Sequence, residues 1–286
     1  MILTAMALMC HCFVFSSCTS APPTAEPKVP PAWKEGAKPP DRDIEDSARL
    51  MERGRKYFDE GNMQPGLFEF VRAAELNPNS SEAYLYIARI CRKTGKNTQA
   101  SESYDIALKI NPEDNGITGE YADFLRMSGD NEKAAKLYAK LVDGGDADLK
   151  TRINFASSLA RAGKQAEAEK AFTGAINAYP DNTDALRAFA GYWFERADES
   201  PAAAADCYEK AAVLYEKASQ IEKTESSKWM FRFLQAQSFY RKWLVTKSDS
   251  DRKKASMIFD GYENCQDELP WKMSARYFLS VLNEND

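Results

Sequence analysis

Histidine is almost absent from this sequence, since the 286 residues contain a single one, His11. Histidine is the commonest general base near neutral pH and the commonest zinc ligand, so the rest of the chain lacks both. Ser-His-Asp and Cys-His catalytic arrangements are therefore excluded beyond the first segment. Glycine-rich phosphate loops and dinucleotide-binding fingerprints are missing too. These absences predict a protein that is not an enzyme and has no catalytic residues, metal site or cofactor.

An excess of basic residues is also missing. Lys and Arg number 38 against 43 Asp and Glu, which gives a formal net charge of −5. Dedicated nucleic-acid binders normally carry a basic footprint. The composition therefore argues against nucleic acid as a partner and is typical of a soluble helical protein.

Two weak chemical patterns have simpler explanations. Ser250 and Lys253 match the Ser-x-x-Lys of some acyl enzymes, but the other motifs of those enzymes are missing, so Ser250 is predicted to be a helix N-cap. No Cys-x-x-Cys pair is present. Cys91 is predicted to be a buried core residue. Cys207 and Cys265 could form a disulfide in an oxidising compartment, but nothing in the sequence sets their distance.

The longest apolar stretch is residues 1–17, MILTAMALMCHCFVFSS. It is shorter than the about 20 apolar residues of a membrane-spanning helix and is typical of a secretory signal. The tract Phe15-Ser-Ser-Cys18 resembles a bacterial lipobox, whose cysteine becomes the lipidated first residue of the mature protein. We therefore predict a signal segment at 1–17 and lipidation of Cys18. A cleaved signal without lipid, or an uncleaved anchor, is the alternative.

Residues 18–43 are predicted to be a linker that begins at the lipidated cysteine. Residues 19–40 hold seven of the thirteen prolines, which prevent helix propagation and favour an extended chain. At about 3.1 Å per residue, this linker could hold the folded part as far as roughly 70 Å from an anchor. The resemblance places the protein in the bacterial cell envelope, lipid-anchored and facing the periplasm, without indicating which membrane carries it.

Glycine recurs at a constant interval in the middle of the chain. Each of Gly61, Gly95, Gly129 and Gly163 lies 34 residues after the one before. Small residues keep this interval at Gly66, Ala100, Ala134 and Ala168, and aromatic residues keep it at Phe70, Tyr104, Tyr138 and Phe172. Four units of 34 residues therefore start at residues 47, 81, 115 and 149 without an insertion.

This pattern resembles the tetratricopeptide repeat, which has the same period and the same small, aromatic and proline positions. The resemblance implies two antiparallel helices per unit, with small residues where the helices cross and the aromatic residue between units. The glycine would end the first helix because it tolerates the left-handed conformation, and a proline such as Pro112 would end the second helix. Each unit buries its faces only by stacking on the next. The predicted fold is all-α, a right-handed superhelical solenoid of about five to six repeats with a C-terminal capping helix.

The predicted array covers residues 44–218 and includes a fifth unit that starts near 183. This unit slips by two residues at ADESPAA, residues 197–203, and then has a long second helix. Residues 219–286 are predicted to form a divergent helical pair and the capping helix. An aromatic stripe there has two interpretations, a helix core or the lining of a pocket for a lipid or small ligand. The stripe consists of Trp229, Phe233, Ala236, Tyr240 and Trp243.

In tetratricopeptide proteins the first helices line a concave groove that often holds an extended peptide or a helix. The resemblance places eight basic residues of this chain in the groove: Arg55, Arg89, Arg92, Lys93, Arg126, Lys150, Arg161 and Arg187. The cluster Arg89, Arg92, Lys93 and Arg126 could hold a carboxylate by charge-assisted hydrogen bonds. The alternative is a solvated face with local ion pairs. The Asn and Lys pattern of the carboxylate clamp that binds chaperone tails is not reproduced.

Together these features predict a non-catalytic, lipid-anchored scaffold or adaptor of the cell envelope that binds an unidentified protein or peptide in its groove. The alternative is a ligand-binding or accessory subunit of an envelope transport system that uses the aromatic C-terminal region. The sequence predicts neither the identity of the partner nor the oligomeric state.

Overall fold

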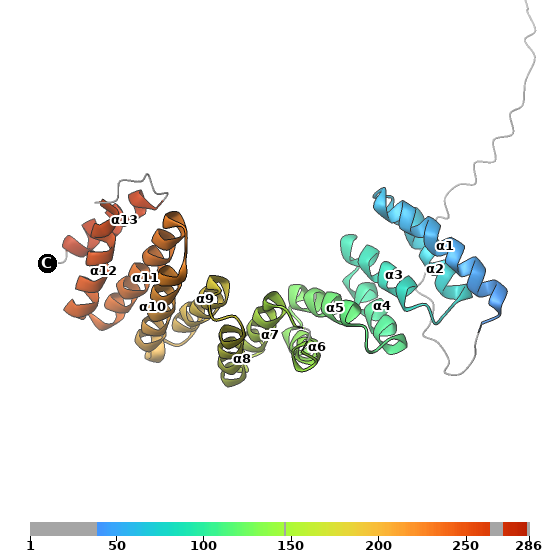
Figure 1. Ribbon diagram of the computed structural model, residues 1–286, viewed down its shortest axis with the longest axis horizontal. Coiled ribbons are helices and arrows are strands. Elements are labelled where there is room, and N and C mark those ends of the chain that lie inside the picture. Colours follow the sequence, from blue (N-terminus) through green and yellow to red (C-terminus); the bar gives the residue numbers. More distant parts are fainter. Residues whose placement is uncertain (1–38, 146, 264–270, 285–286) are drawn as a thin grey trace, which may run out of the picture. The chain divides into compact units, whose positions relative to one another are not determined.

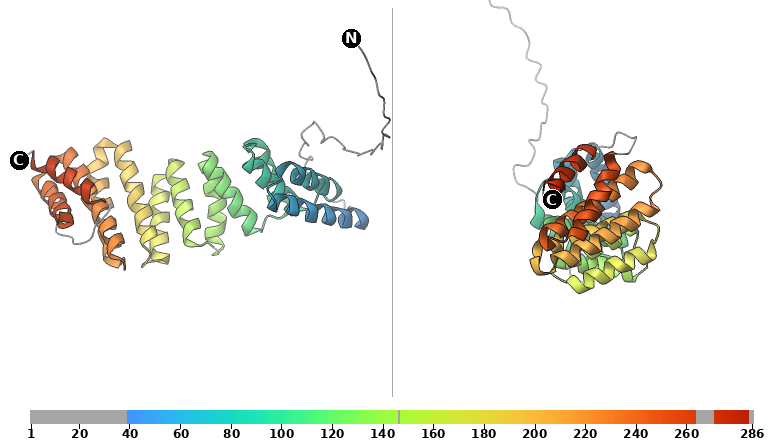
Figure 2. Two further views of the ribbon diagram at one scale, coloured as in Figure 1. Left: turned by 90° about the horizontal axis from the view of Figure 1, so that it is seen from above. Right: turned by 90° about the vertical axis from the view of Figure 1, so that its left-hand side faces the viewer.

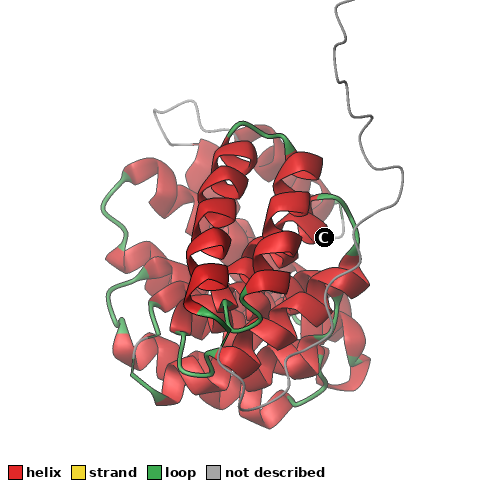
Figure 3. Ribbon diagram, turned by 90° about the vertical axis from the view of Figure 1, so that its right-hand side faces the viewer, coloured by secondary structure: helices red, strands yellow, loops and turns green. Residues whose placement is uncertain are grey.

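The computed structural model describes residues 39–145, 147–263 and 271–284. Within these ranges helices are the only regular elements and no strand is present (Figure 3). The α-helices are α1 (Asp41–Asp59), α2 (Met63–Leu76), α3 (Ser81–Lys93), α4 (Asn97–Ile110), α5 (Asn115–Ser128), α6 (Asn131–Asp143), α7 (Leu149–Arg161), α8 (Gln165–Ala178), α9 (Thr183–Glu199), α10 (Ala204–Ile221), α11 (Glu225–Thr246), α12 (Asp249–Glu263) and α13 (Lys272–Asn283). A short 3-10 helix, η1 (Pro201–Ala203), precedes α10. None of the described helices combines the length and hydropathy of a membrane span.

The predicted N-terminal features lie largely outside the described residues. These features are the signal segment 1–17, the lipidation site Cys18 and the linker up to residue 38. The first helix begins at Asp41, within the predicted linker 18–43 and before the predicted array start at 44.

The chain divides into two compact units, residues 1–78 and 79–286. The described part of unit one is the antiparallel pair α1 and α2. Gly54 on α1 faces the fully buried ring of Phe70 on α2, and the Ser47 hydroxyl donates a hydrogen bond of 2.8 Å to the carbonyl oxygen of Ala73. The predicted small and aromatic positions of the first unit therefore meet at the helix crossing.

Unit two consists of consecutive helix pairs, α3 with α4, α5 with α6, α7 with α8, α9 with α10 and α11 with α12, followed by α13 (Figures 1 and 2). Ala88, Ala100 and Ala107 are fully buried where paired helices approach each other. The ring of Tyr104 on α4 stacks on Tyr121 of α5, with 5.1 Å between the ring centroids. The aromatic residue thus joins one repeat to the next, which confirms the predicted all-α stack of helix pairs.

Glycine ends the first helix of each regular repeat. Gly95, Gly129 and Gly163 of unit two adopt the left-handed conformation, with φ between +76° and +91°. The next position at this interval is Ala197, and α9 continues to Glu199. Without the glycine stop, α9 has 17 residues where α7 has 13. The register slip and the long second helix follow in η1 and in the 18 residues of α10.

The aromatic stripe of α11 packs as core. Phe233, Ala236 and Trp243 are buried against residues of α12 and α13, and Trp229 and Tyr240 are partly buried there. On α12, Phe259 is fully buried and stacks on Phe278 of α13 at 5.2 Å. Ala275 and Leu282 of α13 are buried as well, so α13 covers the end of the stack as predicted.

Cysteine and serine predictions have mixed outcomes. Cys91 is buried, which confirms the core prediction, and Cys207 is also a buried free thiol, whose pKa is raised by burial. Cys265 lies outside the described residues. Ser250 is not an N-cap, because α12 begins at Asp249 and places Ser250 inside its first turn.

Aspartate caps several helices of unit two, and Asp148 at the start of α7 provides a test. Its carboxylate accepts a hydrogen bond of 2.8 Å from the backbone N–H of Thr151, and this bond is the main reason that the pKa of Asp148 is lowered. A cap with a depressed folded-state pKa stabilises the fold fully above the unfolded pKa, and the effect is lost as the pH falls through the folded-state pKa. We expect Asp148→Ala to lower the free energy of unfolding by about 1 kcal/mol at pH 7. Urea denaturation should show a smaller difference at pH 3, whereas Asp143→Ala should change little at either pH.

Candidate partner-binding site

The first helices α3, α5, α7 and α9 share one face of unit two, here called the first-helix face. Hydrogen bonds join neighbouring first helices, for example from Arg89 on α3 to Glu120 on α5 and from Asn154 on α7 to Asp123 on α5. Positions 34 residues apart recur along this face. One such row contains Arg89, Asp123, Ser157 and Gly191, so its side chains become smaller from α5 to α9.

Arg89 and Lys150 of this face pair with acidic residues of a neighbouring first helix. The Arg89 guanidinium donates through both Nε and Nη2 to the carboxylate of Glu120, with an Nε distance of 2.8 Å. This hydrogen bonding raises the pKa of Arg89, and the guanidinium also lies over the Tyr86 ring at 5.0 Å. The Lys150 ammonium lies 3.5 Å from the carboxylate of Asp123. The charges of Arg89 and Lys150 are therefore balanced within the fold.

Asp123 is the centre of a second network on this face. Its carboxylate accepts hydrogen bonds from the Tyr138 hydroxyl and from Asn154 Nδ2, the latter at 3.1 Å. Burial raises the pKa of Tyr138, and the bond to Asp123 acts in the same direction. The network therefore joins α5, α6 and α7.

The other predicted residues differ in their surroundings. Arg92 and Arg126 are half-buried on α3 and α5, and Lys93 is exposed. Arg187 pairs with Asp184 of its own helix at 2.9 Å. Arg161 is exposed and has no hydrogen bond or ion pair with any residue that the structure describes. Arg55 belongs to unit one and is therefore not described as part of this face.

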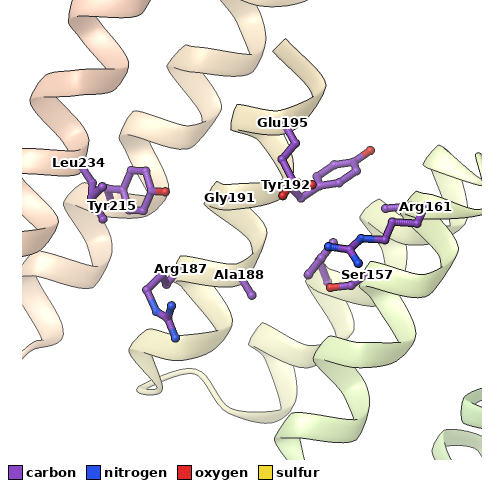
Figure 4. A pocket seen from close by; sticks show the side chains of 11 residues that line it. Ser157, Arg161, Arg187, Ala188, Gly191, Tyr192, Glu195, Tyr215 and Leu234 are labelled. Atoms are coloured by element: carbon purple, nitrogen blue, oxygen red, sulfur yellow. The ribbon is translucent and has the colours of Figure 1, made fainter. Parts of the chain in front are cut away.

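A pocket of about 380 Å³ opens on the first-helix face where the row carries Ser157 and Gly191. Its wall comes from α7, α8, α9, α10 and α11 (Figure 4). It is lined by Ser157, Ala160, Arg161, Phe172, Arg187, Ala188, Gly191, Tyr192, Glu195, Tyr215 and Leu234. Two of the eight predicted groove residues, Arg161 and Arg187, thus line one pocket.

The pocket extends over both sides of α9. Arg161 and Ser157 approach from α7 on one side, and Tyr215 of α10 and Leu234 of α11 lie on the other (Figure 4). Between them α9 presents Gly191, and apart from the adjacent residues and backbone of α9 itself no atom lies within 4 Å of the place where its Cβ would be. The surface of α9 is therefore low at Gly191, and this low point, here called the saddle, connects the two sides of the pocket.

The Tyr215 hydroxyl belongs to a buried side chain of the pocket wall and lacks a hydrogen-bond partner within the described part of the chain. The residue is only 5% exposed, and its oxygen points from α10 toward α9 (Figure 4). It has no hydrogen-bond partner among the described residues. Burial raises the pKa of Tyr215, and the charge of Arg187 opposes this effect. The hydroxyl is therefore neutral at physiological pH and free to donate to a bound acceptor.

The wall of the pocket is held by contacts outside it. The Tyr192 hydroxyl points away from the pocket and donates to Gln165 at 2.9 Å, while Arg196 donates to the same hydroxyl at 2.8 Å (Figure 4). The ring of Phe172 stacks on Phe189 at 5.1 Å. These contacts join α8 and α9 next to the pocket.

Sequence reasoning missed Tyr215 and Leu234 because the slip before α10 breaks the 34-residue register that identified the other residues. The decreasing side-chain size along the row was visible in the sequence and could have indicated the pocket. Among the described residues no group of three potential metal ligands is present.

Comparisons with known proteins agree with this architecture. Residues 92–148 match the family model of the tetratricopeptide repeat. The structure is similar to that of YrrB, with a TM-score of 0.52 and 18% identity over 64% of this chain and 89% of that one. It is also similar to MamA of Desulfovibrio magneticus RS-1, with a TM-score of 0.52 and 13% identity over 63% of this chain and 97% of that one.

Among curated proteins none matches the sequence significantly. At these identities the solved structures show the fold alone. The family match identifies the tetratricopeptide repeat at residues 92–148. The 34-residue spacing of glycine, alanine and aromatic residues continues in the regular helix pairs before and after this range. Residues 92–148 therefore carry the tetratricopeptide repeat, and the described residues have an all-α fold of helix pairs similar to that of a solved tetratricopeptide-repeat protein.

Proposed function

We propose that this protein is a lipid-anchored scaffold of the bacterial cell envelope that binds a partner protein on its first-helix face. The observation that carries the proposal is the preformed pocket at Gly191, which presents arginine and tyrosine donors on a face built from successive first helices. Tetratricopeptide repeats generally bind protein or peptide partners. The structural neighbour YrrB is described as having an unusual peptide-binding site, which is consistent with this use of the fold.

The envelope part of the proposal is supported by the sequence before residue 41. A lipobox-like Cys18 follows an apolar segment and precedes a proline-rich linker. Lipid at the cysteine would hold the chain at a membrane durably if more than one acyl chain is attached. The repeats would then present their binding face at a distance set by the linker.

The alternative of a ligand-binding transport subunit is not proposed, because the aromatic residues on which it depended form the core of α11, α12 and α13.

The test places a photo-crosslinking amino acid at Ser157 of the full chain in bacterial cells. We expect discrete crosslinked products from the membrane fraction, because Ser157 lines the pocket. The matched control carries the same amino acid at Glu102, an exposed residue of the second helix α4. Products from Glu102 but not from Ser157 would show that the partner binds elsewhere.

The same experiment with Cys18→Ser examines the anchor. This variant is expected to leave the membrane fraction and to lose the crosslinked products if the partner is itself in the membrane. A Cys18→Ser chain that stays in the membrane fraction would contradict lipid anchoring at this residue.

A further inference from the structure

We infer that the partner presents an extended acidic segment, whose main chain crosses α9 at Gly191 and whose carboxylate side chain is bound by the donors of the pocket. This inference rests on the proposed function and specifies the chemistry of the partner at the same site. It concerns an internal aspartate or glutamate of the segment.

The first step is the helical glycine. Glycine inside a helix costs about 1 kcal/mol relative to alanine. At Gly191 nothing occupies the space that a side chain would take, so the fold itself does not require glycine there. The absence of a side chain allows a backbone to approach the helix closely. A main chain crossing α9 makes use of this property.

The second step is the balance of hydrogen-bond donors and acceptors. Arg161 offers guanidinium donors on the α7 side that are unpaired among the described residues. Arg187 donates to Asp184 in a solvent-exposed pair and has further N–H donors on the α11 side near the Tyr215 hydroxyl. An arginine has only donors, so the group that satisfies it must be an acceptor. Charge-assisted bonds from arginine to carboxylate are about twice as strong as neutral ones. A carboxylate therefore matches the pocket better than an amide or a hydroxyl.

The third step considers Glu195, the acidic residue in the lining of the pocket. Glu195 lies on the same side of α9 as Arg161, and it has no partner among the described residues (Figure 4). Its charge disfavours a run of carboxylates on that side. The lining carries two arginines and one glutamate, and Arg187 also pairs with Asp184 of its own helix, so Arg161 is the cation of the pocket without a partner among the described residues. This charge suits a segment with a single acidic residue flanked by neutral or basic ones.

Apolar contacts complete the site on the α11 side. Leu234 and the ring of Tyr215 lie beside Arg187 in the pocket wall. A neighbouring aliphatic side chain of the segment can bury against them while its carboxylate reaches the donors. The pocket thus favours an acidic residue next to an apolar one.

The experiment uses random dodecapeptides displayed between fixed flanking sequences, so that no free terminal carboxylate is present. The bait is the full chain with Cys18→Ser, which removes the lipid site. We expect selected peptides to be enriched in Asp or Glu beside an apolar residue. Arg161→Gln and Arg187→Gln should each weaken a selected peptide about tenfold, and Tyr215→Phe should weaken it several-fold while keeping the ring.

Matched variants separate the pocket from the rest of the surface. Gly191→Leu should abolish binding by filling the saddle. Gly174→Leu is its control, because Gly174 is also a helical glycine with open space around its Cβ but lies on α8 outside this pocket. Lys170→Gln on α8 is the control for the arginine substitutions. Both controls should bind as the unmodified chain does.

The outcomes distinguish the inference from the proposed function. Selected peptides that lack acidic residues, or whose affinity is unchanged by Arg161→Gln and Arg187→Gln, would overturn the inference and leave the proposed function intact. Enrichment only in a second library with free C-termini would assign the carboxylate to a chain end and would also overturn it. No selected peptide together with crosslinking from Ser157 would contradict the inference alone, whereas failure of both experiments would contradict the proposed function as well.

Discussion

A Phe259→Ala chain is expected to lose about 3–5 kcal/mol of unfolding free energy in its C-terminal helices. Phe259 is fully buried, and its ring centroid lies 5.2 Å from that of Phe278 and 5.7 Å from that of Phe233. Because these rings belong to α11, α12 and α13, the substitution opens a cavity where three helices meet. Close-packed interiors fill such cavities only in part.

The loss should be local. In a repeat array each unit is stabilised mainly by its neighbours, so the end unit can open without the others. Hydrogen exchange should therefore show faster exchange in α12 and α13, with α3 to α8 unchanged. Met257→Ala is the control, because Met257 lies on the same helix but is 74% exposed. Equal effects of the two substitutions would show that Phe259 does not hold the end of the stack.

A Gly54→Leu substitution is expected to unfold the α1 and α2 pair of unit one. A Cβ added at Gly54 would lie 2.6 Å from a ring carbon of Phe70, a distance that carbon atoms do not tolerate. Phe70 is fully buried and cannot move away without losing its own contacts. Overpacking of this kind typically costs about 1–3 kcal/mol, and occasionally more. A single helix pair has little stability with which to offset that cost.

The measurement is hydrogen exchange or limited proteolysis of residues 41–76. Both should detect an open unit one in the variant, with unit two still protected. Gly174→Leu is the matched control, since the same side chain enters open space on α8 and removes a helical glycine. If the Gly54→Leu chain is as protected as the control, the α1 and α2 pair accommodates the leucine side chain without losing stability, and the prediction is wrong.

The basic groove itself stays a prediction, but the structure shows on which helices its residues lie and which of their charges have partners. The 34-residue interval correctly assigned residues such as Arg89 and Lys150 to first helices, because that assignment depends only on register. Whether each charge is available depends on side chains from the next unit. Glu120 binds Arg89, so this member of the predicted carboxylate-binding cluster already has a partner, and Lys150 outside the cluster pairs with Asp123.

The sequence by itself determined the helix pairs of the regular repeats and the roles of the small, aromatic and glycine positions. These features arise from contacts inside one unit or between consecutive units, and a constant interval repeats them. The glycine at the end of each first helix is the clearest case, because only its backbone conformation matters.

Only the tertiary structure decided where a partner can bind. The pocket combines Arg161 of α7 with Tyr215 of α10 and Leu234 of α11, and the slip before α10 removes the interval that would have connected them. The same packing decided that the aromatic stripe of α11 is core, since it depends on the rings that α12 and α13 bring to it. Periodicity identifies which residues share a helix face, whereas packing between distant segments determines which of them remain open to a partner.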